Sequence, residues 1–90
     1  MRNKHIFAFN GAAAELEIPL PFTPTHVEMW RVNAGAIEHG IKTNMMLTDA
    51  YLSTSTGDDA GVTIGTQKLT IANGADINGA GIVTHGIAWE

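Results

Sequence analysis

The stretch from Gly61 to Trp89 reads GVTIGTQKLTI over 61–71, ANGADINGAG over 72–81 and IVTHGIAW over 82–89. Short runs of β-branched and other apolar residues alternate here with polar ones, and glycine and asparagine separate the runs. This pattern is typical of short strands joined by tight turns. It predicts strands near 61–64, 68–72 and 82–89, and the stretch contains no catalytic cluster.

The N-terminal residues continue the pattern. Residues 4–9 predict a strand. Asn10 and Gly11, which follow it, predict a hairpin turn because both residues tolerate the positive φ of a type I′ turn.

Apolar residues occupy every second position of the next segment, with Glu15 and Glu17 between them; these apolar residues are Leu16, Ile18, Leu20 and Phe22. Such alternation predicts a strand with one buried face. Pro19 and Pro21 lack amide donors, so the end of this strand is expected at a sheet edge or outside the sheet.

The middle of the chain predicts further strands. Residues 26–33 alternate with apolar side chains on both faces, which suits a strand with core on one side and a partner on the other. Residues 36–42 and 45–52 predict two more strands, and the polar run 53–59 predicts a loop. Seven to eight short antiparallel strands with regular turn signals predict an all-β fold, either a small β-sandwich or a jelly-roll-like barrel.

Composition sets limits on size and partners. Ninety residues without an internal repeat or linker predict one domain over 1–90, and the absence of cysteine excludes disulfides and thiol chemistry. Apolar residues make up 44% of the chain and charged residues only 16%. We therefore expect protein neighbours to cover part of the surface, through oligomerisation or docking.

The distribution of charge argues against two classes of partner. The net charge is −4 and the five basic residues are scattered, so nucleic-acid binding is not expected. No apolar run has the length of a membrane span, and no signal-peptide core follows the first basic residues. The sequence predicts a soluble protein made in a cytoplasm.

The polar residues show no pattern of an active site or a cofactor site. The four histidines, His5, His26, His39 and His85, lack metal-ligand spacing, and Asp58 and Asp59 lack the pattern of a calcium loop. The two serines lie in the polar loop without a nucleophile motif. We interpret the chain as a non-enzyme without a cofactor or a metal; an ion held by one of these histidines, or by Asp58 and Asp59, on a symmetry axis of an oligomer stays open.

Residues 61–89 resemble a C-terminal pattern of small tailed-bacteriophage virion proteins. The resemblance rests on the segments 61–64, 69–71 and 75–78, on Gly81, and on the ending Ile87-Ala88-Trp89. Phe22-Thr23-Pro24-Thr25-His26-Val27 resembles a second stretch of these proteins, which precedes a strand ending in asparagine. The chain departs from the pattern at Lys68-Leu69, and at Thr84 and Gly86, where aromatic residues are common.

The resemblance implies a capsid decoration (cement) protein: a small β-sandwich that forms a homotrimer, binds the major capsid protein and lies on the capsid surface of a virion assembled in the host cytoplasm. For contact between subunits we expect the strands that carry Phe7, Phe9, Trp30 and Val32. For contact with the capsid we expect the N-terminal segment of Arg2, Asn3, Lys4 and His5.

Two other functions remain open on the sequence. A head- or tail-fibre module could bind receptor carbohydrate through exposed aromatics and the loop at 53–59, although Trp30, Tyr51 and Trp89 suit core or interface packing better. A tail or neck subunit would form rings or polymers instead of trimers.

Overall fold

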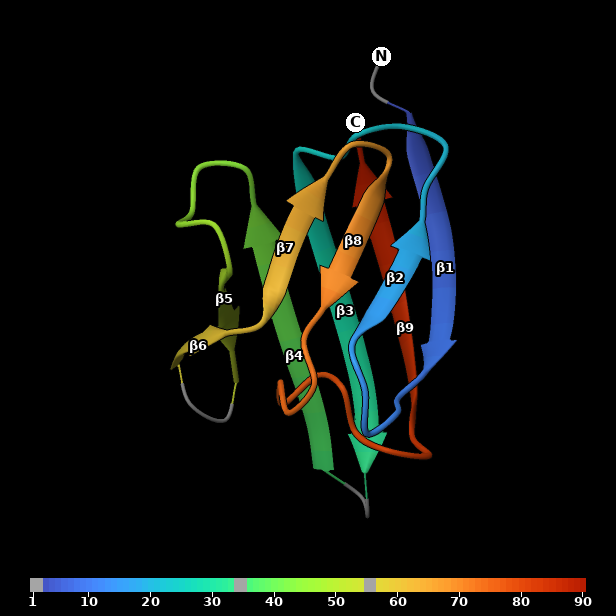
Figure 1. The fold of residues 1–90 in the computed structure, drawn as a ribbon, viewed down its shortest axis with the longest axis vertical. Coiled ribbons are helices and arrows are strands. Elements are labelled where there is room, and N and C mark those ends of the chain that lie inside the picture. The colour runs from blue at the N-terminus through green and yellow to red at the C-terminus, as the bar shows by residue number, and fades with distance from the viewer. Residues whose placement is uncertain (1–2, 34–35, 55–56) are drawn as a thin grey trace.

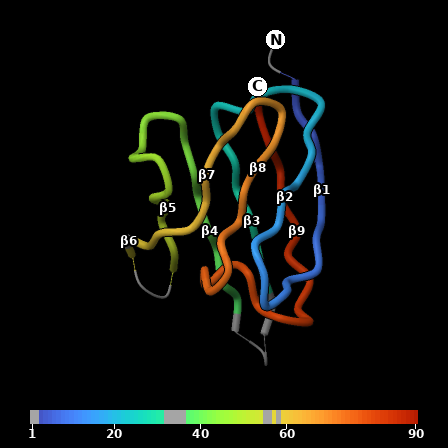
Figure 2. The backbone as a smooth tube through the Cα atoms, in the orientation of Figure 1, coloured from blue at the N-terminus to red at the C-terminus, as the bar shows by residue number. Residues whose placement is uncertain are grey.

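The computed structural model describes residues 3–33, 36–54 and 57–90, with the backbone alone at Val32, Asn33, Ala36 and Asp58. The described chain forms nine strands (Figures 1 and 2). They are β1 (Lys4–Asn10), β2 (Leu16–Pro19), β3 (His26–Asn33), β4 (Ala36–Thr43), β5 (Ala50–Ser53), β6 (Gly57–Ala60), β7 (Val62–Gly65), β8 (Lys68–Ile71) and β9 (Val83–Trp89).

The strands form two antiparallel sheets. Six strands make the larger sheet in the order β1-β9-β3-β4-β5-β6, and three make the smaller one in the order β2-β8-β7. The smaller sheet lies across one face of the larger sheet, with β7, β8 and β2 in front of the longer strands in Figure 1. The predicted all-β sandwich is therefore confirmed, with nine strands in place of seven or eight.

The hairpin predicted at Asn10-Gly11 is wrong. β1 pairs with β9 and β2 pairs with β8, so the chain passes from one sheet to the other after Asn10. Gly11 instead lies against the segment before β9, where a Cβ atom would come within 1.9 Å of the Gly79 carbonyl oxygen. Glycine is required here because two backbone segments approach closely and leave no room for a side chain. The predicted reason was a positive φ, which Gly11 does not have.

The strand predicted over 45–52 and the loop predicted over 53–59 need correction. β4 ends at Thr43, and the segment 44–49 is a loop before the short strand β5. β6 then lies inside the predicted loop and pairs with β5. Gly57, Asp58 and Asp59 give no apolar signal that would predict this strand. An edge strand needs little apolar content, so it can form without one.

The core lies between the two sheets, and every second side chain along most strands points into it. The buried apolar side chains are Phe7, Phe9, Leu20, Phe22, Val27, Met29, Tyr51, Val62, Leu69, Ile71, Ala75, Ile77 and Ala88. Leu16 and Ile18 on β2 pack against this cluster, while Glu15 and Glu17 are exposed. The predicted buried face of this segment is thus confirmed, and β2 is an edge strand as its prolines indicated.

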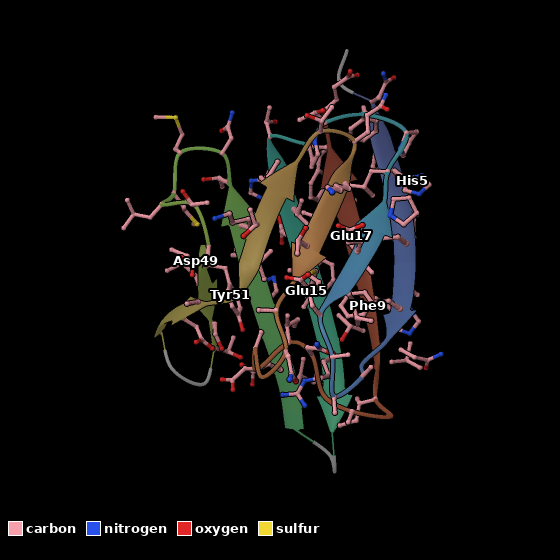
Figure 3. The ribbon with its side chains drawn as sticks, in the orientation of Figure 1. His5, Phe9, Glu15, Glu17, Asp49 and Tyr51 are labelled. Atoms are coloured by element: carbon pink, nitrogen blue, oxygen red, sulfur yellow. The ribbon has the colours of Figure 1, made fainter. Side chains whose placement is uncertain are left out.

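Tyr51 is the one tyrosine of the chain, and it is buried in the core beneath the β7 side of the small sheet. Its hydroxyl donates to Asp59 Oδ2 at 3.1 Å and accepts from the Ile77 amide at 3.3 Å. Burial raises the pKa of the Tyr51 hydroxyl, and the negative charge of Asp59 adds to this, against the opposing effect of the Ile77 amide. Figure 3 shows Tyr51 on β5, beside the segment that carries Asp49.

This raised pKa predicts a loss of stability in alkaline solution. An unfolded tyrosine ionises near its ordinary pKa of about 10, whereas Tyr51 in the folded chain keeps its proton to higher pH. The unfolded state then binds fewer protons than the folded state, so the free energy of unfolding falls as the pH rises above about 10. Urea unfolding at several pH values should show that Tyr51→Phe is less stable than wild type near neutrality but declines less steeply above pH 10. Parallel curves for the two proteins would contradict this explanation.

Candidate interaction surface

The six-stranded sheet has one face turned away from the small sheet, which we call the open face. Because side chains alternate along a strand, the residues between the core positions of β1, β9, β3 and β4 all project there. The strand registers align them in rows: Ile6, Ile87, Glu28, Ile41 and Leu52 form one, and Ala8, His85, Trp30 and His39 form the next.

The open face carries unusually exposed apolar side chains. Among the described residues, six large apolar side chains are strongly exposed: Ile6, Ile37, Met45, Leu47, Leu52 and Val83. All but Met45 and Leu47 belong to strands and lie on the open face. Ile6 and Ile37 are 69% and 63% exposed. Exposed apolar side chains gathered on one face of a sheet are typical of surfaces that contact other proteins.

A polar cluster lies in the middle of this apolar surface. Glu28 is flanked by two imidazoles, with His26 Nε2 3.0 Å from its Oε2 atom and His39 Nε2 3.3 Å from its Oε1 atom. The i, i+2 spacing on β3 places His26 beside Glu28, and the β3–β4 register brings His39 across from Trp30. All three side chains are about one-third exposed.

Two tryptophans close the ends of this cluster. The Trp30 ring stacks parallel on His39 with centroids 5.0 Å apart, and the Trp89 ring meets His26 edge-on at 5.2 Å. The five side chains therefore form a continuous row from Trp89 through His26, Glu28 and His39 to Trp30. These contacts hold both indoles in place, which suits rigid aromatic anchors of an interface.

The described contacts of this cluster are two imidazole–carboxylate hydrogen bonds and two ring contacts. Neither imidazole has a described contact with a hydroxyl that could act as a nucleophile, as an activated serine or threonine would require. Among residues 3–33, 36–54 and 57–90, no group of three or more histidine, aspartate or glutamate side chains is arranged to hold a metal ion. The surface offers apolar area, two aromatic anchors and one carboxylate with its histidine partners.

A second surface feature is the loop 44–49, beside β5. The buried Lys42 Nζ donates to the carbonyls of Leu47, Thr48 and Ala50 at 2.7, 3.1 and 2.6 Å. Burial lowers the pKa of the Lys42 ammonium, while Asp49 opposes this shift. The ammonium fixes a loop whose tip exposes Met45 and Leu47, next to a hollow of about 570 Å³ lined by Met46, Leu47, Ala50, Asp59 and Ala60.

The structure separates the residues predicted for subunit contact. Trp30 lies half-buried on the open face, where a partner can reach it. Phe7 and Phe9 are corrected as contact side chains: both point into the core, stacked with their ring centroids 6.4 Å apart. That the strand which carries them makes the subunit contact stays a prediction. The side chain of Val32 lies outside the described part of the chain.

The residues predicted for capsid contact cluster at the start of β1. Arg2 lies outside the described residues, whereas Asn3 and Lys4 are exposed and His5 is half-buried. Asn3 Nδ2 donates to the Glu90 carboxylate, which ties the two ends of the described chain together. Figure 3 shows His5 near the start of β1 and Phe9 farther along the strand.

The two aspartates considered for an ion do not form a described ion site. Asp59 is engaged with Tyr51 and with the Ala60 amide, and the side chain of Asp58 lies outside the described residues. No pattern in the sequence indicates that His39 lies beside Glu28. Only the β3–β4 register reveals it; the spacing of His26 and Glu28 was the one signal visible in the sequence.

No protein family, curated protein or solved structure matches this chain. Within the described residues, no helix is long and apolar enough to cross a membrane.

Proposed function

We propose that this chain is a non-enzymatic structural protein of a tailed-bacteriophage virion, a capsid decoration protein that binds the major capsid protein on the outside of the shell. The observation that carries the proposal is the open face, an uncovered sheet with exposed apolar side chains around two fixed indoles. The virion location and the homotrimer are what the resemblance of residues 61–89 to tailed-bacteriophage virion proteins implies.

The open face suits broad contact with a protein better than capture of a small ligand. One face of the Trp30 ring is covered by His39, and His85 lies beside Trp30 on the neighbouring strand. A carbohydrate-binding platform needs a free aromatic face, so the fibre-module alternative has less support. The hollow lined by Met46, Leu47, Ala50, Asp59 and Ala60 lies at the β5–β6 end of the large sheet, beside the 44–49 loop.

The proposal predicts that charge on the open face abolishes shell binding. Ile37→Asp and Leu52→Asp each place a carboxylate where a partner would bury an apolar side chain, yet both positions are exposed and tolerate the change in the free protein. We expect each to weaken binding about tenfold or more, because an unpaired charge is costly in a buried interface. Co-sedimentation with shells assembled from the cognate major capsid protein measures the effect.

Leu47→Asp is the matched control, since Leu47 is even more exposed, at 81% against 63% for Ile37 and 44% for Leu52, but belongs to the 44–49 loop and not to a strand of the large sheet. It should bind shells like wild type. Absence of saturable binding by the wild-type protein would overturn the proposed function. Equal loss for Leu47→Asp would overturn the assignment of the open face.

A further inference from the structure

The sheets have four edges among the described strands, and three of them are protected against pairing. β2 and β7 have four residues each, β2 ends at Pro19, and the Val62 amide of β7 donates to the Asp49 carbonyl at 3.2 Å. β6 has four residues, two of them aspartates. Short length, proline, charge and covered amides are the usual means of keeping an edge from pairing.

β1 is the exception. It has seven residues, KHIFAFN, without proline or acidic residues, and its described pairing is with β9 alone. In Figure 1 it forms the outer border of the large sheet. Its one lysine, Lys4, stands at the first position, so the rest of this long edge can act as a template for another strand.

The backbone groups of β1 that face outward can be identified from its two ends. The Glu90 amide donates to the Asn3 carbonyl and the Gly11 amide donates to the Ile82 carbonyl, both at 2.9 Å. In an antiparallel ladder the bonded residues alternate, so the odd-numbered residues from 3 to 11 bond to β9. The amides and carbonyls of the even-numbered residues therefore point to the free edge; these residues are Lys4, Ile6, Ala8 and Asn10.

We infer that β1 pairs with β1 of a second copy of this chain, antiparallel and centred on Phe7. This register sets Ile6 opposite Ala8 of the second copy, and Lys4 opposite its Asn10. Each such pair exchanges two backbone hydrogen bonds, so every outward amide and carbonyl of the four residues finds a partner. Shifting the centre by one residue, to Ile6, would set Asn10 opposite position 2, outside β1.

Side chains and charges agree with a second copy as the occupant. The two-fold axis runs perpendicular to the sheets, so both open faces lie on the same side and join into one. The pairing brings Ile6, which is 69% exposed, against Ala8 of the second copy. The two lysines at position 4 lie at opposite ends of the pair, whereas a β6 pair would set aspartates near each other. Like charges opposed across strands destabilise a sheet.

This inference rests on the proposed assembly role and adds a two-fold contact to it. An isologous contact gives even numbers of copies. The expected assembly is a dimer, or six copies where three-fold contacts also form. The pairing between copies uses the edge of β1, whereas the proposed shell binding uses the open face. A variant can therefore lose one of the two interactions and keep the other.

Ala8→Pro tests the pairing directly. Proline removes the outward amide of Ala8 without breaking a bond to β9, a position where edge strands accept proline. Light scattering from about 500 µM to about 5 µM should show wild type at an even multiple of the 9.6 kDa chain at high concentration, and Ala8→Pro at half that mass. Ile6→Asp, which keeps the backbone intact and sets two carboxylates near the axis, should have the same effect, while Leu47→Asp should match wild type.

Amide hydrogen exchange gives a second readout. In a monomer the amides of Ile6 and Ala8 exchange fast while those of His5, Phe7 and Phe9 are protected; in the pair all five are protected. Wild type that stays at one or three copies at 500 µM, or that keeps the alternating exchange pattern, overturns the inference. If Ala8→Pro still binds shells, the proposed function is supported, whether or not β1 pairs with a second copy.

Discussion

Asn78→Asp is expected to lower the free energy of unfolding by about 3 kcal/mol, equivalent to roughly 12–24 °C in Tm for a domain of this size. Asn78 is buried and connects two loops, the one between β1 and β2 and its own between β8 and β9. Its Oδ1 atom accepts from the Ala12 amide at 2.8 Å, and its Nδ2 atom donates to the carbonyls of Ala14 and Ala72 at 3.0 and 3.1 Å.

Only an amide provides the required acceptor and both donors from one side chain. A carboxylate of nearly the same shape would turn an oxygen toward those two carbonyls, and the repulsion would be buried. Thermal unfolding by circular dichroism measures the loss, which should diminish in acid as the introduced carboxyl gains a proton and can donate once. Asn73→Asp, an equivalent change at an exposed turn, should shift Tm by a few degrees at most. Equal Tm values for wild type and Asn78→Asp would contradict this role.

Gly86→Ala is expected to destabilise the protein by about 1–3 kcal/mol, because a Cβ atom there would lie 2.4 Å from Cζ of the buried Phe7 ring. The backbone at Gly86 is ordinary extended strand, so the loss would come from overlap with the ring and not from a strained φ. Gly86 thus makes room for Phe7, which explains the small residue where the resembling proteins commonly have aromatic side chains.

The core offers a matched control for this substitution. Gly40 and Gly86 flank Met29 in the same row of the sheet, but a Cβ atom on Gly40 would meet Tyr51 at an ordinary 3.4 Å. Gly40→Ala should therefore be neutral or stabilising by up to about 1 kcal/mol. Combining Gly86→Ala with Phe7→Leu should recover part of the lost stability in urea unfolding. A double variant no more stable than the sum of the two single losses would show that the ring is not the obstacle.

The sequence predicted strands well where one face is buried. Alternation located β2, β3, β7, β8 and β9, since a period of two is visible whenever core and solvent sides differ in polarity. It failed at β6, whose sequence Gly-Asp-Asp-Ala shows no alternation, and at 45–49, where apolar Met45 and Leu47 occupy a loop. The loop is held by Lys42, and a cation that caps carbonyls five to eight residues away leaves no local pattern to read.

The candidate site was visible only in fragments. Trp30 and the His26–Glu28 spacing could be found in the sequence, but His39 and Trp89 join them through pairings of β3 with β4 and of β3 with β9. The inward direction of Phe7 and Phe9 likewise depends on which face of β1 the small sheet covers.

The sequence by itself determined the class of this protein: all-β, cysteine-free, weakly charged and built from short strands. Alternation and turn chemistry are local properties, so neighbouring residues are enough to express them. The tertiary structure alone decided that β1 pairs with β9 instead of β2, that Gly11 and Gly86 serve close packing, and that two histidines share Glu28. These features depend on strands far apart along the chain, and their register follows from packing two whole sheets against each other.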